Sequence, residues 1–122
     1  MKLCRLFERR RRRRMPFMRG KDGDARRKEE RAALARILEE VRERERNHRR
    51  LARHIREKYL PDGVLQREYA GKVPRLPVSG CAPRFARASA WYWVHADGAE
   101  DARRRVDELE GRLEVLRGVA ET

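Results

Sequence analysis

Residues 24–60 read DARRKEERAALARILEEVRERERNHRRLARHIREKYL, and this uninterrupted stretch decides the fold. It contains no glycine or proline, and it consists mostly of Arg, Glu, Ala and Leu, which are all good helix formers. The stretch therefore predicts one long charged helix, about 55 Å from end to end at the usual helical rise.

Apolar side chains recur along this predicted helix at the three- and four-residue steps of a heptad seam. Arg44 and His48 interrupt the seam at its centre, and His48 is interpreted as a polar position that sets register or oligomer state. So narrow an apolar stripe predicts that the helix pairs with another helix. The expected pairing residues are Leu34, Ile37, Val41, Leu51 and Ile55.

The composition indicates a small basic protein with a limited core. A chain of 122 residues has room for one domain at most, and charged residues (43%) outnumber hydrophobic ones (39%). The formal net charge of +13 is extreme for this length. Such a charge indicates an anionic partner, with nucleic acid as the first expectation and anionic lipid as the second.

Residues 1–23 are expected to form a disordered basic tail. Six consecutive arginines repel one another in free solution, and they could become ordered on phosphates through counterion release. The same run could instead serve as a nuclear or nucleolar address, and a mitochondrial presequence is a weaker alternative. The six residues are Arg9, Arg10, Arg11, Arg12, Arg13 and Arg14.

The second half of the long helix carries arginines at steps of four, three, four and three residues, so they share one face. Guanidinium groups bind phosphate through two hydrogen bonds and also stack on bases, so this face is a candidate for RNA or DNA backbone. In the alternative interpretation, the face is solvated and its charge is offset by glutamates of the other helix. Its members are Arg42, Arg46, Arg49, Arg53 and Arg56.

Residues 61–98 are expected to form an extended Pro- and Gly-rich connector that includes an aromatic segment. Each proline fixes φ and removes a hydrogen-bond donor. The aromatic segment, residues 85–95, is predicted as a strand or an extended segment with Trp91 and Trp93 on one face. Two interpretations stay open: these rings complete the core between the helices, or they stack on bases with help from Arg84 and Arg87.

Residues 99–122 predict a short C-terminal amphipathic helix. Asp97 is expected as its N-cap, and Glu100 has capping-box spacing to it. This helix is expected to pack on the long helix, as a helical hairpin, or on its own copy, as a coiled-coil dimer. The pairing residues are Val106, Leu109, Leu113 and Leu116, with Ala102 and Ala120 on the same seam.

The sequence predicts no enzymatic activity, no cofactor and no metal site. It has no Gly-rich phosphate loop, and Ser79 and Ser89 are its only serines. His48 and His54 are six residues apart, so they do not share a helix face, and no cysteine lies near them. Cys4 and Cys81 are expected to be reduced thiols. No apolar run approaches the roughly 18 residues of a membrane span.

We therefore predict a small helical RNA-binding protein that recognises backbone and shape through charge, without reading base sequence. A ribonucleoprotein subunit, as in a ribosome, or a small viral protein that binds double-stranded RNA would fit this description. The alternative is a non-enzymatic helical subunit that binds an acidic protein or membrane surface. A cytoplasmic, nuclear or nucleolar location is expected, with a mitochondrial location as the other option, and a homodimer would fit the heptad seams.

Overall fold

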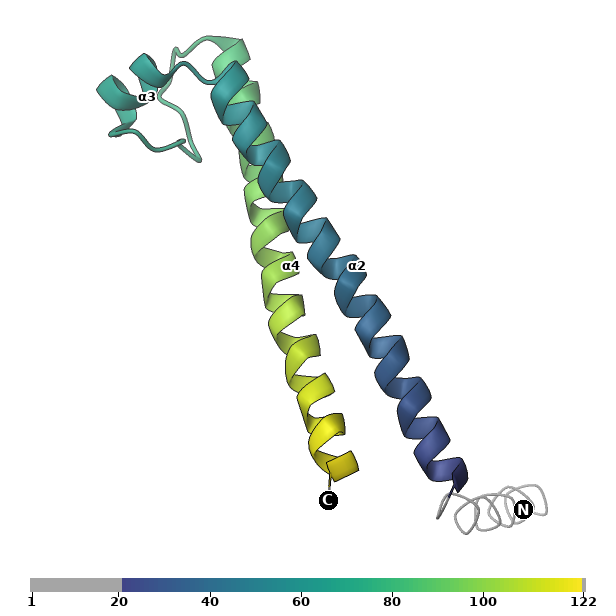
Figure 1. Ribbon diagram of the computed structural model, residues 1–122. Helices are drawn as coiled ribbons and strands as arrows, with labels where there is room; N and C mark the ends of the chain where they lie inside the picture. Colours follow the sequence, from purple (N-terminus) through teal and green to yellow (C-terminus); the bar gives the residue numbers. More distant parts are fainter. Residues whose placement is uncertain (1–20, 122) are drawn as a thin grey trace, which may run out of the picture. The chain divides into compact units, whose positions relative to one another are not determined.

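A computed structural model of the chain describes residues 21–121, in which all regular secondary structure is helical (Figure 1). The helices are α2, Lys21–Tyr59, α3, Asp62–Tyr69, and α4, Pro83–Glu121. The prediction of a mainly helical protein is confirmed for this part of the chain. The arginine run at residues 9–14 of the predicted tail lies outside the described residues.

Helix α2 corresponds to the long helix expected over residues 24–60, and it begins three residues earlier, at Lys21. It ends at Tyr59, shortly before Pro61, because the proline ring fixes φ and its nitrogen has no hydrogen to donate. Arg56 and Lys58 occupy the last turn, where positive charge complements the helix dipole.

The expected extended connector over residues 61–98 is wrong in its extent, because helix occupies much of this range. Helix α3 follows Pro61 directly. It stops where Ala70 and Gly71 adopt left-handed φ angles of 55° and 79°, and the Gly71 amide donates a hydrogen bond to the Leu65 carbonyl at 2.8 Å. The non-helical parts of the connector are therefore Pro61 and residues 70–82.

The strand or extended segment predicted for residues 85–95 is also wrong, since these residues form the first turns of α4. Pro83 lies in the first turn of α4, where a missing amide hydrogen costs nothing. Phe85 and Ala88 are buried and Tyr92 is half-buried, at steps of three and four, so the helical period decides this segment. Asp97, expected as an N-cap, lies inside α4.

The chain divides into two compact units. Unit 1 contains the described residues 21–37 of α2 and 109–121 of α4. Within unit 1, Leu109 and Leu113 are buried, whereas Leu34 and Leu116 are half-buried. Unit 2, Leu38–Glu108, holds α3, the loop after it and the adjoining parts of α2 and α4.

The core of unit 2 draws on all four of its segments. Its buried members are Ile55, Leu60, Leu65, Val73, Phe85 and Ala88. Tyr92 and Trp93 pack against this cluster, and the rings of Tyr69 and Phe85 stack with centroids 5.5 Å apart. The short helix α3 is thus held by side-chain burial, since eight residues are too few to form a stable helix alone.

Within unit 2, α2 and α4 run antiparallel, because His48 contacts His95 and Glu45 contacts Arg103 (Figure 1). The buried positions of α2 are Leu38, Val41, Glu45, Ala52 and Ile55, with His48 half-buried. The expected seam shares Val41, His48 and Ile55 with this set. It differs at the positions between them.

Ile37 and Leu51, which were expected on the seam, are 42% and 39% exposed. The burying face is rotated toward Glu45 and Ala52, the neighbours of Arg44 and Leu51 in the sequence. Glu45 can be buried because Arg49 and Arg103 lie 3.4 and 3.7 Å from its carboxylate oxygens.

His48 and His95 meet between the two helices, with their Nδ1 atoms 3.0 Å apart. Gly98 makes room for this pair, because a Cβ atom there would lie 3.0 Å from the His48 ring. Burial lowers the pKa of His95, and the nearby His48 lowers it further.

Candidate nucleic-acid interface

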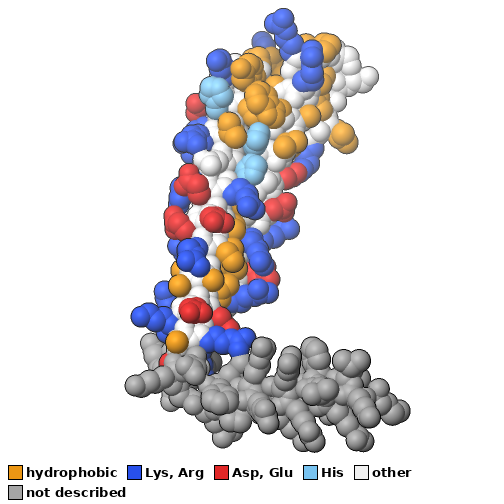
Figure 2. Space-filling view, turned by 90° about the vertical axis from the view of Figure 1, so that its right-hand side faces the viewer, with side chains coloured by type: hydrophobic (Ala, Val, Ile, Leu, Met, Phe, Trp, Pro, Cys, Tyr) orange, Lys and Arg blue, Asp and Glu red, His pale blue; other side chains and the backbone are white. Residues whose placement is uncertain are grey.

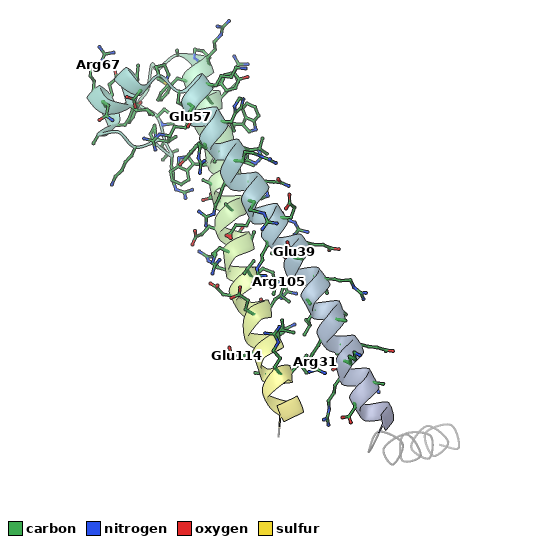
Figure 3. The ribbon with its side chains drawn as sticks, viewed as in Figure 1. Arg31, Glu39, Glu57, Arg67, Arg105 and Glu114 are labelled. Atoms are coloured by element: carbon green, nitrogen blue, oxygen red, sulfur yellow. The ribbon has the colours of Figure 1, made fainter. Side chains whose placement is uncertain are left out.

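Charge is unevenly distributed within unit 2. Residues 47–96, which we call the basic end, carry ten Lys or Arg against three acids. Residues 38–46 and 97–108, the acidic end, carry nine acids against six Arg. Figure 2 shows hydrophobic and histidine side chains gathered beside Lys and Arg on one face, and Figure 3 labels Glu57 and Arg67 of the basic end and Glu39 and Arg105 of the acidic end.

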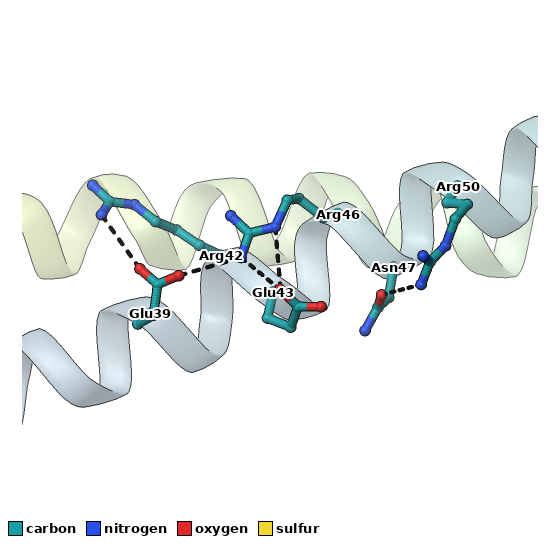
Figure 4. A network of polar contacts seen from close by, with 6 residues as sticks. All are labelled: Glu39, Arg42, Glu43, Arg46, Asn47 and Arg50. Carbon is teal, nitrogen blue, oxygen red and sulfur yellow. Dashed lines mark hydrogen bonds and ion pairs between the residues drawn. The ribbon is translucent and has the colours of Figure 1, made fainter.

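The first two residues of the expected arginine face are paired with acids of α2 itself (Figure 4). Arg46 lies 2.6 Å from Glu43 and 3.2 Å from Glu39, and Arg42 lies 3.9 Å from Glu39. The hydrogen bond from Arg46 lowers the pKa of Glu43. This part of the face is therefore largely neutralised by acids of α2 itself, whereas the alternative interpretation of the sequence expected glutamates of the other helix.

The remaining three arginines of the face meet on one side of unit 2. Arg49, Arg53 and Arg56 line a pocket of about 560 Å³ together with Arg75 from the loop between α3 and α4. The small side chains of Ala52, Ala96 and Ala99 leave the space that the pocket occupies. Its other lining residues are Tyr92, Trp93, Asp97 and Glu100, and we call the whole set the arginine pocket.

The guanidinium groups of the arginine pocket differ in how firmly they are held. Arg56 donates to the Gly71 carbonyl oxygen at 2.7 Å, which anchors it to the loop. Arg49 lies 3.4 Å from Glu45 and is half-exposed. Arg53 forms no hydrogen bond or ion pair with any residue that the structure describes. Arg53 is thus the group most available to an anion.

Arg75 fastens the loop to α4. Its guanidinium lies 3.8 Å from the centroid of the Trp93 ring and donates to both carboxylate oxygens of Asp97, at 2.7 and 2.9 Å. This pairing lowers the pKa of Asp97 and raises that of Arg75. The Trp93 Nε1–H donates to the Val73 carbonyl oxygen at 3.2 Å. Trp93 therefore has both its ring and its polar atom engaged within the protein.

Trp91 does not share this site, because two residues along a helix correspond to about 200° of rotation. It is 45% exposed, and its ring lies 5.7 Å from that of Tyr59 and 6.3 Å from that of His95. It contributes to a second open pocket, of about 860 Å³, which we call the Trp91 groove. The groove is lined by Lys58, Tyr59, Arg84, Arg87, Ala88 and Trp91.

The structure thus divides the residues that the sequence proposed for nucleic-acid binding. Arg49, Arg53, Arg56 and Trp93 come together, Arg42 and Arg46 lie further along α2, and Trp91 lies on another flank. Sequence reasoning did not assign Arg75 or Asp97 to the site. The loop that carries Arg75 has no periodicity from which its contacts could be inferred, and only the placement of α3 brings it to α4.

Among residues 21–121, no group of three or more His, Cys, Asp or Glu could hold a metal ion. In the same part of the chain, no helix is long and apolar enough to cross a membrane. The chain matches no protein-family model, no curated protein and no solved structure. The functional assignment therefore depends on the chemistry of the two pockets.

Proposed function

We propose that this chain is a small basic RNA-binding protein, without catalytic activity, that recognises the RNA backbone through the arginine pocket. The observation that carries the proposal is the convergence of Arg49, Arg53, Arg56 and Arg75 on one pocket. Guanidinium groups form paired hydrogen bonds with phosphate oxygens, and the four guanidinium groups outnumber the two carboxylates of the pocket, Asp97 and Glu100, so the pocket favours an anion. A role as a subunit of a ribonucleoprotein particle would use this chemistry.

The predicted selectivity is for backbone and charge. The arginine pocket offers guanidinium groups, the Trp93 ring, which Arg75 already covers, and the half-buried Tyr92 ring, and neither guanidinium groups nor ring faces read base edges. The arginine run at residues 9–14 would add further phosphate contacts and a steeper dependence on salt. Glu45 and Asp97 hold Arg49 and Arg75 in place before RNA arrives, which reduces the entropy lost on binding.

A second candidate function is a helical subunit that binds an acidic protein or a membrane surface. It is favoured by the exposure of Ile37 and Leu51, which the sequence predicts as pairing residues. The same two side chains would serve a homodimer. A competition experiment separates the two candidates. If polyglutamate and anionic vesicles, added at equal charge concentration, do not displace bound RNA, the RNA-binding function is favoured.

Arg53→Gln gives the cleanest test of the proposed function, because Arg53 has no partner in the described part of the chain and its loss should leave the fold intact. Fluorescence anisotropy with a labelled RNA should show several-fold weaker binding. The slope of log K against log salt should fall by ~0.7 to 0.9 for one lost phosphate contact.

Arg104→Gln is the matched control, since Arg104 lies in the acidic end and 76% of its side chain is exposed. It removes the same charge and should change RNA affinity little. Equal effects of the two substitutions would show that only net charge matters, and would contradict a role for the arginine pocket. No RNA binding by the full chain at ~100 mM salt would contradict the proposed function as a whole.

A further inference from the structure

We propose that the Trp91 groove binds unpaired bases of single-stranded RNA by stacking them on Trp91 and Tyr59. This inference rests on the proposed function and extends it from the phosphate backbone to the bases. It concerns a different flank of α4 from the one that carries the arginine pocket.

The first observation is that both aromatic rings in the groove are partly exposed, although Lys58 Nζ lies over the Tyr59 ring, 5.7 Å from its centroid. Trp91 is 45% exposed and Tyr59 is 47% exposed, although both belong to residue types that are usually covered. Their ring centroids are 5.7 Å apart at an angle of 45°, so the two rings form adjoining walls. The structure gives Trp91 no hydrogen bond to any described residue, in contrast to Trp93.

The second observation is the charge around these rings. Lys58, Arg84 and Arg87 line the groove, and no carboxylate is among the described residues that line it. Arg84 forms no hydrogen bond or ion pair with the described residues. Arg87 donates to the Pro83 carbonyl oxygen at 3.4 Å, a contact long enough to be given up for a phosphate. The lining therefore combines open π faces with three cations.

This combination matches a nucleotide better than other occupants. An unpaired base offers a π face for Trp91, and its phosphates offer negative charge for the cations. Paired bases in a duplex cannot reach the rings, so the groove predicts a preference for single strands. A lipid surface or an amphipathic peptide would need more aliphatic lining than Ala88, the one aliphatic side chain among the described residues of the groove.

The test compares Trp91→Phe with Trp91→Leu in the full chain. Both side chains are apolar and differ mainly in the π face, so base stacking should tolerate Phe but not Leu. The ligands are a labelled uridine-rich RNA of ten nucleotides and an abasic oligonucleotide of the same length and charge. Trp91→Leu should weaken binding of the RNA about tenfold, which corresponds to ~1.4 kcal/mol. Neither substitution should change binding of the abasic strand or the salt slope.

A spectroscopic measurement gives an independent readout. In Trp93→Phe, the only tryptophan left is Trp91, whose fluorescence should be quenched by the RNA and not by the abasic strand. Far-UV circular dichroism checks the fold of this variant, and the affinity comparison above does not depend on it.

Four outcomes would overturn the inference. Equal affinities of the Phe and Leu variants for the RNA, or equal affinities of the wild type for the RNA and the abasic strand, would leave only backbone binding, and the proposed function would stand. Trp91 fluorescence that shifts to the blue with anionic phosphatidylserine vesicles, and is unaffected by RNA, would assign the groove to a membrane. If neither oligonucleotide binds, the proposed function fails as well.

Discussion

The arginine pocket and the Trp91 groove are built from the same residue types on two flanks of α4, but they differ in what those residues contact. In the arginine pocket, Arg75 covers the Trp93 ring and bonds Asp97, and the indole nitrogen donates to the backbone. In the Trp91 groove, the ring is half-exposed and the cations have few protein partners. A tryptophan beside arginine thus serves structure on one flank and is available to a ligand on the other.

The largest expected difference between the two flanks is in stability. Trp93→Ala should lower the free energy of unfolding by about 2 to 3 kcal/mol, because it removes a ring packed on the core and an indole hydrogen bond. Trp91→Ala should cost less than about 1 kcal/mol, since that ring is half-exposed. Urea unfolding followed by far-UV circular dichroism measures both. Equal losses would mean that Trp91 is also structural.

Removing Arg75, which covers the Trp93 ring, should make the environment of Trp93 resemble that of Trp91. In a Trp91→Phe background, Trp93 is the only fluorophore, and Arg75→Ala should raise its quenching by acrylamide. Arg67→Ala is a suitable control, because Arg67 bonds only the Gly63 carbonyl oxygen within α3. Unchanged quenching with Arg75→Ala would show that the core, rather than Arg75, shields Trp93.

Lowering the pH should reduce the stability of the protein through His95, which lies beside Trp91. Its pKa is lowered from the ordinary value of 6.5 by burial and by His48, so the folded protein takes up a proton less readily than the unfolded chain. The resulting stability is fully present above about pH 6.5 and is lost as the pH falls below that value. Urea unfolding at pH 7.5 and pH 5 should show this loss.

The control for the acid effect is His95→Gln. This substitution should reduce the difference in unfolding free energy between pH 7.5 and pH 5, because the contributions of carboxylates are the same in both proteins. Since Trp91 lies 6.3 Å from His95, its fluorescence in Trp93→Phe should change over the same pH range. Trp93 fluorescence in Trp91→Phe should change less. The opposite pattern would place the acid-sensitive contact on the other flank.

The smallest expected effects come from a pair of glycines in α4. Gly111→Ala should stabilise the protein by about 1 kcal/mol, because Ala favours helix and nothing lies within 4 Å of the new Cβ. Gly98→Ala should stabilise the protein less than Gly111→Ala or should destabilise it, because the new Cβ would lie 3.0 Å from the His48 ring. Thermal unfolding of the two variants decides this. Equal gains would show that the His48 ring moves aside freely.

The sequence predicted the helices better than their partners. Residues 24–60 are rich in helix formers and lack Gly and Pro, so local preference alone sufficed for α2. The period of two suggested by Trp91 and Trp93 was misleading, because the helical spacing of Phe85, Ala88 and Tyr92 decides burial in that segment.

The rotation of α2 could not be predicted from hydrophobicity, since the most apolar choice of seam contains Ile37 and Leu51. The structure instead buries Glu45 and Ala52. Glu45 also has a contact between helices, with Arg103, and no count along one helix includes it. The spacing along one helix likewise predicted that the five arginines share a face. Which of them pair with glutamates and which line the pocket depends on the fold.

The separation of charge within unit 2 has a consequence for how the protein would meet a polyanion. With an excess of seven positive charges at one end and three negative charges at the other, unit 2 has a large electric dipole moment. In the field of a nucleic acid, this dipole would favour an orientation of unit 2 with the loop between α3 and α4 leading, while the residues outside unit 2, which carry nine of the 13 net positive charges, would be attracted as well. The orienting effect of this dipole would disappear once salt shortens the range of the field.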